Sequence, residues 1–149
     1  MNEKGEQALV KVGQVNYIAD ITVREHKLVA DEPVTLGGAD KGPNPYELLL
    51  SSLGACTAMT LRIYAGRKDW PLEEVSVQLS HTKDYVEDCE DCDEKDLKID
   101  RIVKKIELKG DLSEEQRKRL MQIADRCPVN KTLLGEIKIE SQEWKPTEV

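Results

Sequence analysis

A helix predicted from GPNPYELLLSSLGAC, residues 42–56, is the feature around which the rest of the chain can be organised. Asn44 is a good N-cap, Pro45 suits the first helical position, and Glu47 falls three residues after the cap, as in a capping box. The helix is expected to run to about Ala65, where a glycine follows as a possible stop. Because it is apolar on nearly every side, we expect it to be buried at the centre of the fold.

Short strands are predicted before this helix. Residues 8–15 alternate apolar and polar side chains, residues 17–23 carry Ile18, Ile21 and Val23, and a third run begins at Leu28. Residues 24–27 look like the turn between the second and third runs. Residues 37–45 are dense in Gly and Pro and should form the loop that leads into the helix.

Two further strands are predicted after the helix, at 75–79 and 99–108. Between them lies a very acidic segment, residues 84–96, which is expected to be a solvated loop. Val75, Val77 and Leu79 alternate in the first of these strands, whereas the apolar residues of the second, Ile99, Ile102, Val103, Ile106 and Leu108, indicate an irregularity near Arg101.

A second amphipathic helix is predicted to begin with a cap at 113–116 and to be stopped by Pro128, immediately after Cys127. Residues 130–134 are expected to add one more turn, and 137–139 a last strand. The order βββ-α-ββ-α-β predicts an α+β fold, with residues 1–149 forming one domain.

Composition and charge exclude several classes of protein. With 22 basic and 29 acidic residues the formal net charge is −7, so nucleic acid is not an expected partner. Hydrophobic residues make up 39% and Phe is absent, and so lean a core leaves dimerisation open. The N-terminus carries no apolar signal region, and the apolar stretch 48–65 is interrupted often enough that we expect no membrane span. A cytoplasmic protein with reduced thiols is expected.

Cys56 and Cys127 are the first candidates for chemistry. Composition alone favours two buried, inert cysteines, since free Cys is among the most buried residue types.

The residues around the two cysteines favour a different interpretation. GPNPYELLL at 42–50, LGAC at 53–56 and RCPVNKTL at 126–133 resemble the two signature segments of the OsmC/Ohr family. The order of predicted elements agrees with that family along nearly the whole chain.

The resemblance implies a fold, an assembly and an activity. The fold would have antiparallel sheets wrapped around a long central helix, and two chains would form an intertwined homodimer with active sites at the interface. Cys56 would attack an organic hydroperoxide as the thiolate and become a sulfenic acid, and Cys127 would resolve it as a disulfide. A dithiol would then reduce the enzyme, which needs no cofactor.

The residues that support the cysteine in the family's peroxidases are not reproduced here. Those members use a Glu at the helix start, at the position of Tyr46, and an Arg from the first strand pair. Glu47 stands one residue later, on about the opposite side of the helix from Cys56, so capping is its expected role. Arg24, in a turn, and Arg126, beside the second cysteine, are the possible supporting cations, together with Arg62 further along the helix.

Cys89 and Cys92 form a second pair within the acidic segment. Their spacing suits zinc or a redox disulfide, but one such pair supplies only half of a four-thiolate site. Three interpretations stay open: an incidental pair in a solvated loop, a zinc site completed by a second chain, by carboxylates or by His81, and a redox shuttle to Cys56 and Cys127.

The leading hypothesis is therefore a thiol-dependent reductase of organic hydroperoxides in oxidative-stress defence, which acts on a small peroxide with a dithiol reductant. The alternatives are a non-enzymatic domain that binds a small apolar or electrophilic ligand, and a zinc-binding structural module through Cys89 and Cys92.

Overall fold

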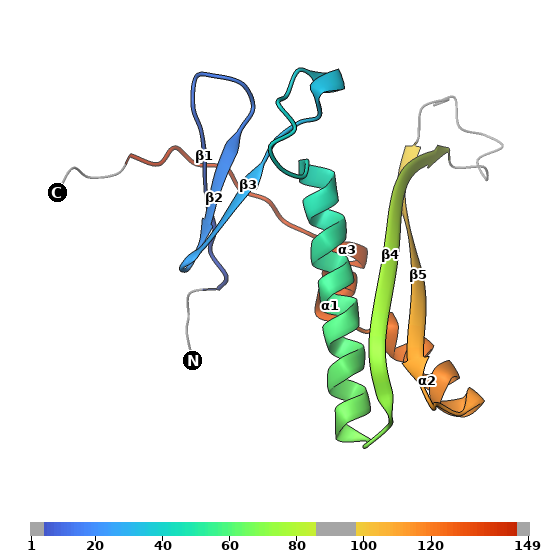
Figure 1. Cartoon of the computed structure of the whole chain (residues 1–149). Helices are drawn as coiled ribbons and strands as arrows, with labels where there is room; N and C mark the ends of the chain where they lie inside the picture. The colour runs from blue at the N-terminus through green and yellow to red at the C-terminus, as the bar shows by residue number, and fades with distance from the viewer. Residues whose placement is uncertain (1–4, 86–97, 146–149) are drawn as a thin grey trace, which may run out of the picture. The chain divides into compact units, whose positions relative to one another are not determined.

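The computed structural model describes residues 5–85 and 98–145 and has the α+β architecture predicted from the sequence (Figure 1). A three-stranded sheet, a long helix, a two-stranded sheet and two shorter helices follow one another along the chain. The elements are β1 (Leu9–Val12), β2 (Ala19–Val23), β3 (His26–Ala30), the short 3-10 turn η1 (Val34–Leu36), α1 (Pro45–Arg67), β4 (Leu72–Tyr85), β5 (Lys98–Gly110), α2 (Glu114–Ala124) and α3 (Pro128–Leu134).

The chain divides into two compact units. The first comprises Met1–Ser52 with Leu79–Lys104, and the second comprises Leu53–Gln78 with Lys105–Val149. The helix α1 and the paired strands β4 and β5 contribute to both units.

The sheet of the first unit has the strand order β1-β2-β3, and both pairs are antiparallel. Val23 pairs with His26, so the turn between β2 and β3 contains only Arg24 and Glu25. The predicted turn, 24–27, was therefore too long, because His26 and Lys27 already belong to the ladder. Arg24 takes the left-handed backbone conformation, with φ 54°, that so tight a connection requires.

A buried carboxylate organises the loop between β3 and α1. Asp31 is 2% exposed and accepts hydrogen bonds from the backbone N–H groups of Glu32 (2.8 Å), Ala39 (3.1 Å) and Lys41 (3.1 Å). These bonds, with the Lys41 N–H contributing most, lower the pKa of the Asp31 carboxyl, although burial opposes the shift. One side chain thus binds three backbone positions of the loop that leads into α1, in addition to the loop's own backbone bonds.

The start of α1 has the capping box that the sequence predicts. The Asn44 N–H donates to the Glu47 carboxylate at 2.8 Å, and the Glu47 N–H donates to the Asn44 side-chain oxygen at 2.9 Å. The predicted end was two residues early, because the helix continues through Gly66 to Arg67. The chain then turns at Asp69, whose φ is 53°.

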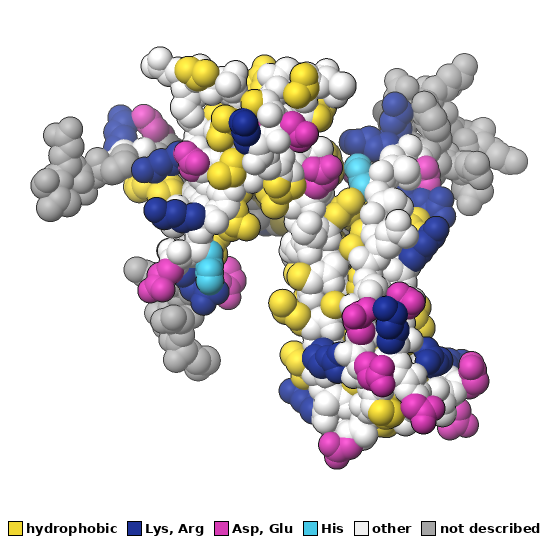
Figure 2. Space-filling model, in the orientation of Figure 1, with side chains coloured by type: hydrophobic (Ala, Val, Ile, Leu, Met, Phe, Trp, Pro, Cys, Tyr) yellow, Lys and Arg dark blue, Asp and Glu magenta, His cyan; other side chains and the backbone are white. Residues whose placement is uncertain are grey.

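Burial along α1 differs from the expected central position. Its buried residues form one stripe, namely Leu53, Gly54, Thr57, Leu61 and Ala65. Met59 and Ile63 are 64% and 54% exposed, so within one chain α1 is covered on one side only. Figure 2 shows hydrophobic side chains at the surface along this helix and over the three-stranded sheet. By length and mean hydropathy, 1.3, α1 could cross a membrane, contrary to the expectation from its polar residues; core helices of soluble proteins meet the same criterion.

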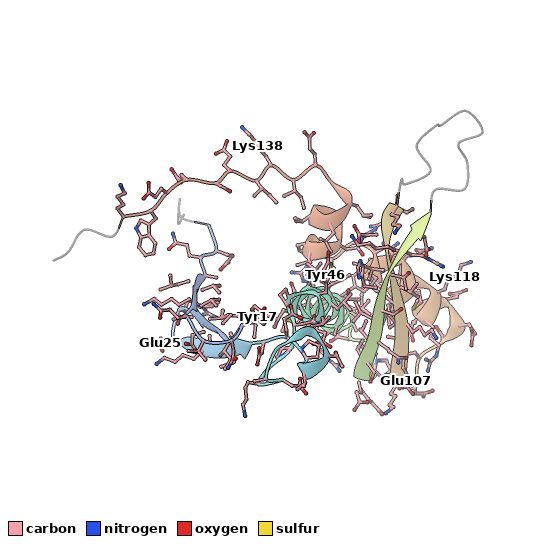
Figure 3. The ribbon with its side chains drawn as sticks, turned by 90° about the horizontal axis from the view of Figure 1, so that it is seen from above. Tyr17, Glu25, Tyr46, Glu107, Lys118 and Lys138 are labelled. Atoms are coloured by element: carbon pink, nitrogen blue, oxygen red, sulfur yellow. The ribbon has the colours of Figure 1, made fainter. Side chains whose placement is uncertain are left out.

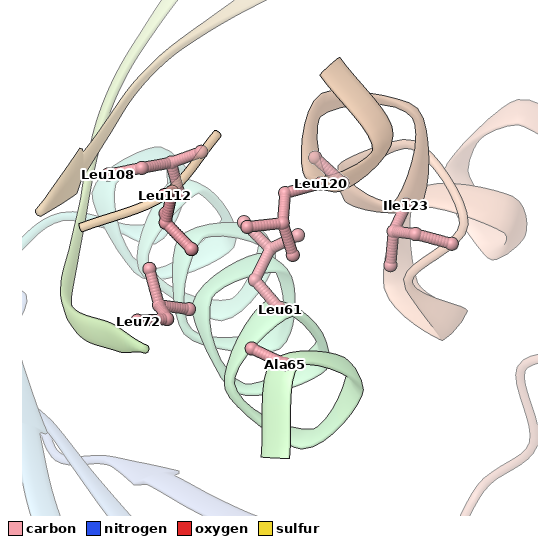
Figure 4. Packing of buried hydrophobic residues seen from close by; sticks show 8 residues of the cluster. Leu61, Ala65, Leu72, Leu108, Leu112, Leu120 and Ile123 are labelled. Carbon is pink, nitrogen blue, oxygen red and sulfur yellow. The ribbon is translucent and has the colours of Figure 1, made fainter. Parts of the chain in front are cut away.

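The core of the second unit lies between α1, α2 and the ends of β4 and β5 (Figure 4). Two arginines fasten these elements through backbone carbonyls. Arg62 of α1 donates to the carbonyls of Leu72 and Glu73, and Arg117 of α2 donates to those of Leu108 and Gly110. The cluster itself consists of Leu61, Ala65, Leu72, Leu108, Leu112, Leu120, Ile123 and Ala124.

The C-terminal third of the chain contains the main differences from prediction. The predicted cap of α2 is confirmed, because Ser113 and Gln116 exchange hydrogen bonds at 2.9 and 3.1 Å. However, α2 ends at Ala124, and Pro128 begins α3 instead of stopping α2. Proline is favoured at the first helical position because its missing N–H needs no partner there. Residues 137–139 form no strand in the described part of the chain.

The two strands after α1 are longer than predicted. β4 continues to Tyr85 and therefore takes in the first residues of the segment 84–96 that was expected to be loop. β5 extends the predicted strand by a residue or two at each end. Hydrogen bonds to the neighbouring strand stabilise polar residues in the β conformation as well. The alternation of apolar and polar residues does not identify such positions.

Candidate functional site

Cys127 occupies a defined place at the start of α3. It is the N-cap residue, fully buried, and its sulfur accepts a hydrogen bond from the Asn130 N–H at 3.3 Å. The Thr57 hydroxyl lies 3.6 Å from the same sulfur. Because the Thr57 hydroxyl donates its own hydrogen to the Leu53 carbonyl (2.8 Å), the thiol hydrogen is the one available for the Thr57–Cys127 contact. The buried thiol is thus hydrogen-bonded on both sides.

Cys56 is the residue before Thr57 on α1, and its thiol is half-buried. Successive helical residues point about 100° apart, so Cys127 packs one position around the helix from Cys56. Both thiols are free and both belong to the second unit. Two cysteines 71 residues apart in sequence therefore flank the same turn of α1, the second of them through Thr57, which sequence reasoning had missed. Their pairing as a disulfide stays a prediction.

The possible supporting residues occupy other positions. Glu47 is engaged in the capping box, nine residues or about 14 Å along the helix axis from Cys56. Arg24 is exposed in the β2–β3 turn. Arg62 gives its guanidinium to two carbonyls of β4, and Arg126 is exposed beside the buried Cys127. None of these contacts brings a cation to the sulfur of Cys56.

His81, which the sequence suggests as one possible further ligand of a zinc site, has two defined partners in the first unit. Its ring stacks on Tyr46 with centroids 4.7 Å apart and planes 11° apart, and Nε2 lies 2.7 Å from the Asp100 carboxylate. This bond to His81 is the main cause of a lowered Asp100 pKa, with further charge from Lys83 at 3.7 Å. Tyr46, labelled in Figure 3, holds the position at which the resembled peroxidases carry Glu.

The proposed zinc pair, Cys89 and Cys92, lies outside the described residues. Within 5–85 and 98–145, no group of three or more His, Cys, Asp or Glu side chains is placed to hold a metal ion. Zinc binding by the pair stays a prediction.

An open groove of about 490 Å³ runs beside the middle of α1. Its lining combines apolar side chains from the helix and from β4 with an arginine and two glutamates. The lining residues are Ala58, Met59, Arg62, Ile63, Glu73, Glu74 and Val75, all in the second unit.

Comparison with solved structures identifies the fold. The chain superimposes on an OsmC-like protein from Mycoplasma pneumoniae with a TM-score of 0.71 and 20% identity, covering 89% of each chain. Organic hydroperoxide resistance proteins from Legionella pneumophila and Elizabethkingia anophelis give TM-scores of 0.63 and 0.65 at 20% and 18% identity. These matches cover 91% and 93% of this chain and 93% and 94% of theirs, respectively.

Sequence comparison extends this result from fold to family. No curated protein sequence matches the chain. The family described as OsmC-like protein does match, over residues 38–142, a range that includes α1, both central strands and both C-terminal helices. Because the match covers most of the chain, the resemblance first seen in the segments around Cys56 and Cys127 is confirmed, and this chain belongs to the OsmC-like protein family.

Proposed function

We propose that this protein is a thiol-dependent reductase of organic hydroperoxides, with Cys56 as the attacking residue and Cys127 as the resolving one. The observation that carries the proposal is the Thr57–Cys127 contact of 3.6 Å, which joins the second cysteine to the helical turn that bears the first. Family membership adds support, since several structural neighbours are named organic hydroperoxide resistance proteins.

The chemistry uses only the two thiols, the peroxide and a dithiol. The Cys56 thiolate attacks the terminal peroxide oxygen, the O–O bond breaks, and the alkoxide leaves and takes up a proton to become an alcohol. The sulfenic acid on Cys56 then condenses with the Cys127 thiol to form a disulfide and release water. An external dithiol reduces that disulfide by exchange and becomes a disulfide itself.

The difference in burial favours this assignment of roles. Cys56 is half-buried and can meet a substrate, whereas Cys127 is fully buried and hydrogen-bonded by Asn130 and Thr57. A buried thiol is protected from direct oxidation but is available to a sulfenic acid that forms beside it. The difference in accessibility therefore supports Cys56 as the attacking thiol and Cys127 as the resolving thiol.

Reaction with cumene hydroperoxide tests the proposal. A Cys89→Ser, Cys92→Ser double variant limits the thiol count to Cys56 and Cys127, since the chain has four cysteines. Reduced protein should lose both remaining thiols rapidly. Adding Cys56→Ser should abolish the reaction, and adding Cys127→Ser should leave a sulfenic acid that dimedone traps. Slow loss of thiol in the double variant, equal to that of the same protein unfolded in urea, would reject the proposal.

The expected setting is a cytoplasmic homodimer that works with a dithiol reductant. Exposed apolar side chains on α1, such as Met59 and Ile63, support association with a second copy. A cytoplasmic location fits free thiols at Cys56 and Cys127.

The second candidate is a non-enzymatic binding domain for a small apolar ligand. It is favoured by the groove beside α1, whose 490 Å³ falls within the range of about 300–1,000 Å³ typical of small-molecule sites. Arg62 donates to two backbone carbonyls and does not stabilise a Cys56 thiolate, which also favours this candidate. Saturable binding of a hydrophobic dye that survives Cys56→Ser, together with no thiol loss in peroxide, would favour binding over catalysis.

A further inference from the structure

Tyr64, near the C-terminal end of α1, lies at the centre of a group of positive charges that the thiol chemistry does not use. Its ring packs against the hydrophobic cluster of the second unit, and Trp70 meets it edge-on with centroids 5.5 Å apart and an interplanar angle of 71°. These contacts hold the phenol in one orientation.

Two cations approach this phenol, one from α2 and one from the residue that follows α1. Arg119 of α2 donates from Nε to the Tyr64 hydroxyl at 3.1 Å, while its Nη1 is fixed by the Gln122 side chain at 3.0 Å. The Lys68 ammonium and the Arg119 guanidinium each lie 5.8 Å from the centroid of the Tyr64 ring. The bonds of Arg119 to Tyr64 and Gln122 fix its guanidinium, so the positive charge beside the phenol does not come from a surface lysine alone.

Positively charged side chains surround the Tyr64 hydroxyl. The hydrogen bond from Arg119 is the main cause of a lowered Tyr64 pKa, and the charges of Arg119, Lys68 and Arg126 act in the same direction against the effect of burial. A field that favours phenolate over phenol also favours any other anion at that point. This is notable in a chain whose net charge is −7.

We propose that Tyr64, Lys68 and Arg119 form a binding site for a phosphate monoester or inorganic phosphate. The Tyr64 hydroxyl accepts from Arg119 and still has its own hydrogen to donate to an anion oxygen. Arg119 uses Nε for Tyr64 and Nη1 for Gln122, so its Nη2 remains to donate to an anion oxygen. Two cations, Lys68 and Arg119, match a doubly charged phosphate better than a singly charged carboxylate.

The site is distinct from the thiols and goes beyond the proposed reductase function. Tyr64 stands seven residues after Thr57, on the same side of α1 and about 10 Å further along the helix axis. A phosphate bound there would not contact Cys127, so phosphate binding can be measured whether or not the protein reduces peroxides.

Calorimetric titration of the reduced full chain with inorganic phosphate, at an ionic strength fixed with sodium chloride, tests the proposal. We expect saturable binding to one site per chain. Lys68→Gln and Arg119→Gln should each weaken it about tenfold, the effect of losing one charged partner. The matched control is Lys118→Gln, which removes the same charge from the neighbouring position of α2 (Figure 3) and should leave the affinity unchanged.

Two further measurements sharpen the test. Phosphate should raise the pH at which Tyr64 ionises, followed as phenolate absorbance against a Tyr64→Phe reference, because the bound anion cancels the positive potential. Acetate at the same ionic strength should bind about tenfold more weakly.

The proposal is overturned if wild-type protein shows no saturable phosphate binding, if Lys118→Gln weakens binding as much as Lys68→Gln, or if acetate binds as tightly as phosphate. Lys68 is exposed, so its variant should fold even if Arg119→Gln does not.

Discussion

Glu47 illustrates how far a single side chain could be assigned from its neighbours in sequence. Its position three residues after Asn44 predicted a cap, and both bonds of the capping box are present. Replacing it with Ala should lower the free energy of unfolding by about 0.5–2 kcal/mol, the usual cost of losing a cap. Glu47→Gln, which keeps an acceptor for the Asn44 N–H, is the matched control and should lose much less. Urea denaturation measures both. Peroxide reactivity per folded molecule should change little, and a hundredfold loss with unchanged stability would contradict a capping role.

Thr57 is the residue-scale feature that the sequence did not reveal. Its hydroxyl bonds to Leu53 on its own helix and to Cys127. Thr57 and Cys127 are 70 residues apart in sequence, so no local pattern predicts their contact. Thr57→Val keeps the shape but removes the acceptor of the thiol hydrogen, so stability should fall by about 1 kcal/mol, the value of one buried hydrogen bond. Thr60→Val, on the less buried side of α1, is the control and should cost less. Equal losses in urea denaturation would show that the Cys127 contact adds nothing.

At the scale of elements, the beginnings of helices were predictable and their ends were not. Asn44 and Ser113 cap through partners three residues away, so local sequence contains the whole signal. Pro128 is compatible with ending one helix or beginning another, and in the structure Cys127 caps α3 so that Pro128 is its first residue. The stack of Tyr46 on His81 and the bond from His81 to Asp100 depend on tertiary placement, which no local pattern specifies.

The β4–β5 pair carries a prediction about acid stability. The His81 hydrogen bond lowers the Asp100 pKa, so Asp100 stabilises the fold above its unfolded pKa of about 3.9, and this contribution is lost as the pH falls through the lower folded value. Asp100→Asn should therefore flatten the fall in melting temperature on acidification below about pH 5. Asp20→Asn, at an exposed position of β2, should leave the fall in melting temperature below about pH 5 unchanged. If the melting temperatures of wild type and Asp100→Asn fall in parallel with pH, the bond between His81 and Asp100 contributes nothing to acid stability.

At the scale of the whole molecule, one chain leaves much of its apolar surface uncovered. The three-stranded sheet exposes Val10, Val12 and Leu28 by 54%, 57% and 46%, and α1 exposes Met59 and Ile63. Exposed apolar side chains gathered on one sheet, or along one helix, are typical of an association surface. The sequence anticipated this through its lean core and its apolar helix, although only the structure shows which residues one chain leaves open.

We therefore expect light scattering at micromolar concentration to give twice the 16.9 kDa chain mass. If the exposed side of α1 is part of the interface, a Met59→Asp, Ile63→Asp double variant should shift the mass toward 16.9 kDa, because two buried carboxylates without partners would oppose association. The same two substitutions lie outside the buried stripe of α1, so the folded monomer should keep its helical circular dichroism.

Met121→Asp, at a 44% exposed position of α2, is the control and should leave the mass at twice that of the chain. A wild-type protein that is a clean monomer at this concentration would contradict the dimer, and a double variant that stays dimeric would move the interface away from Met59 and Ile63.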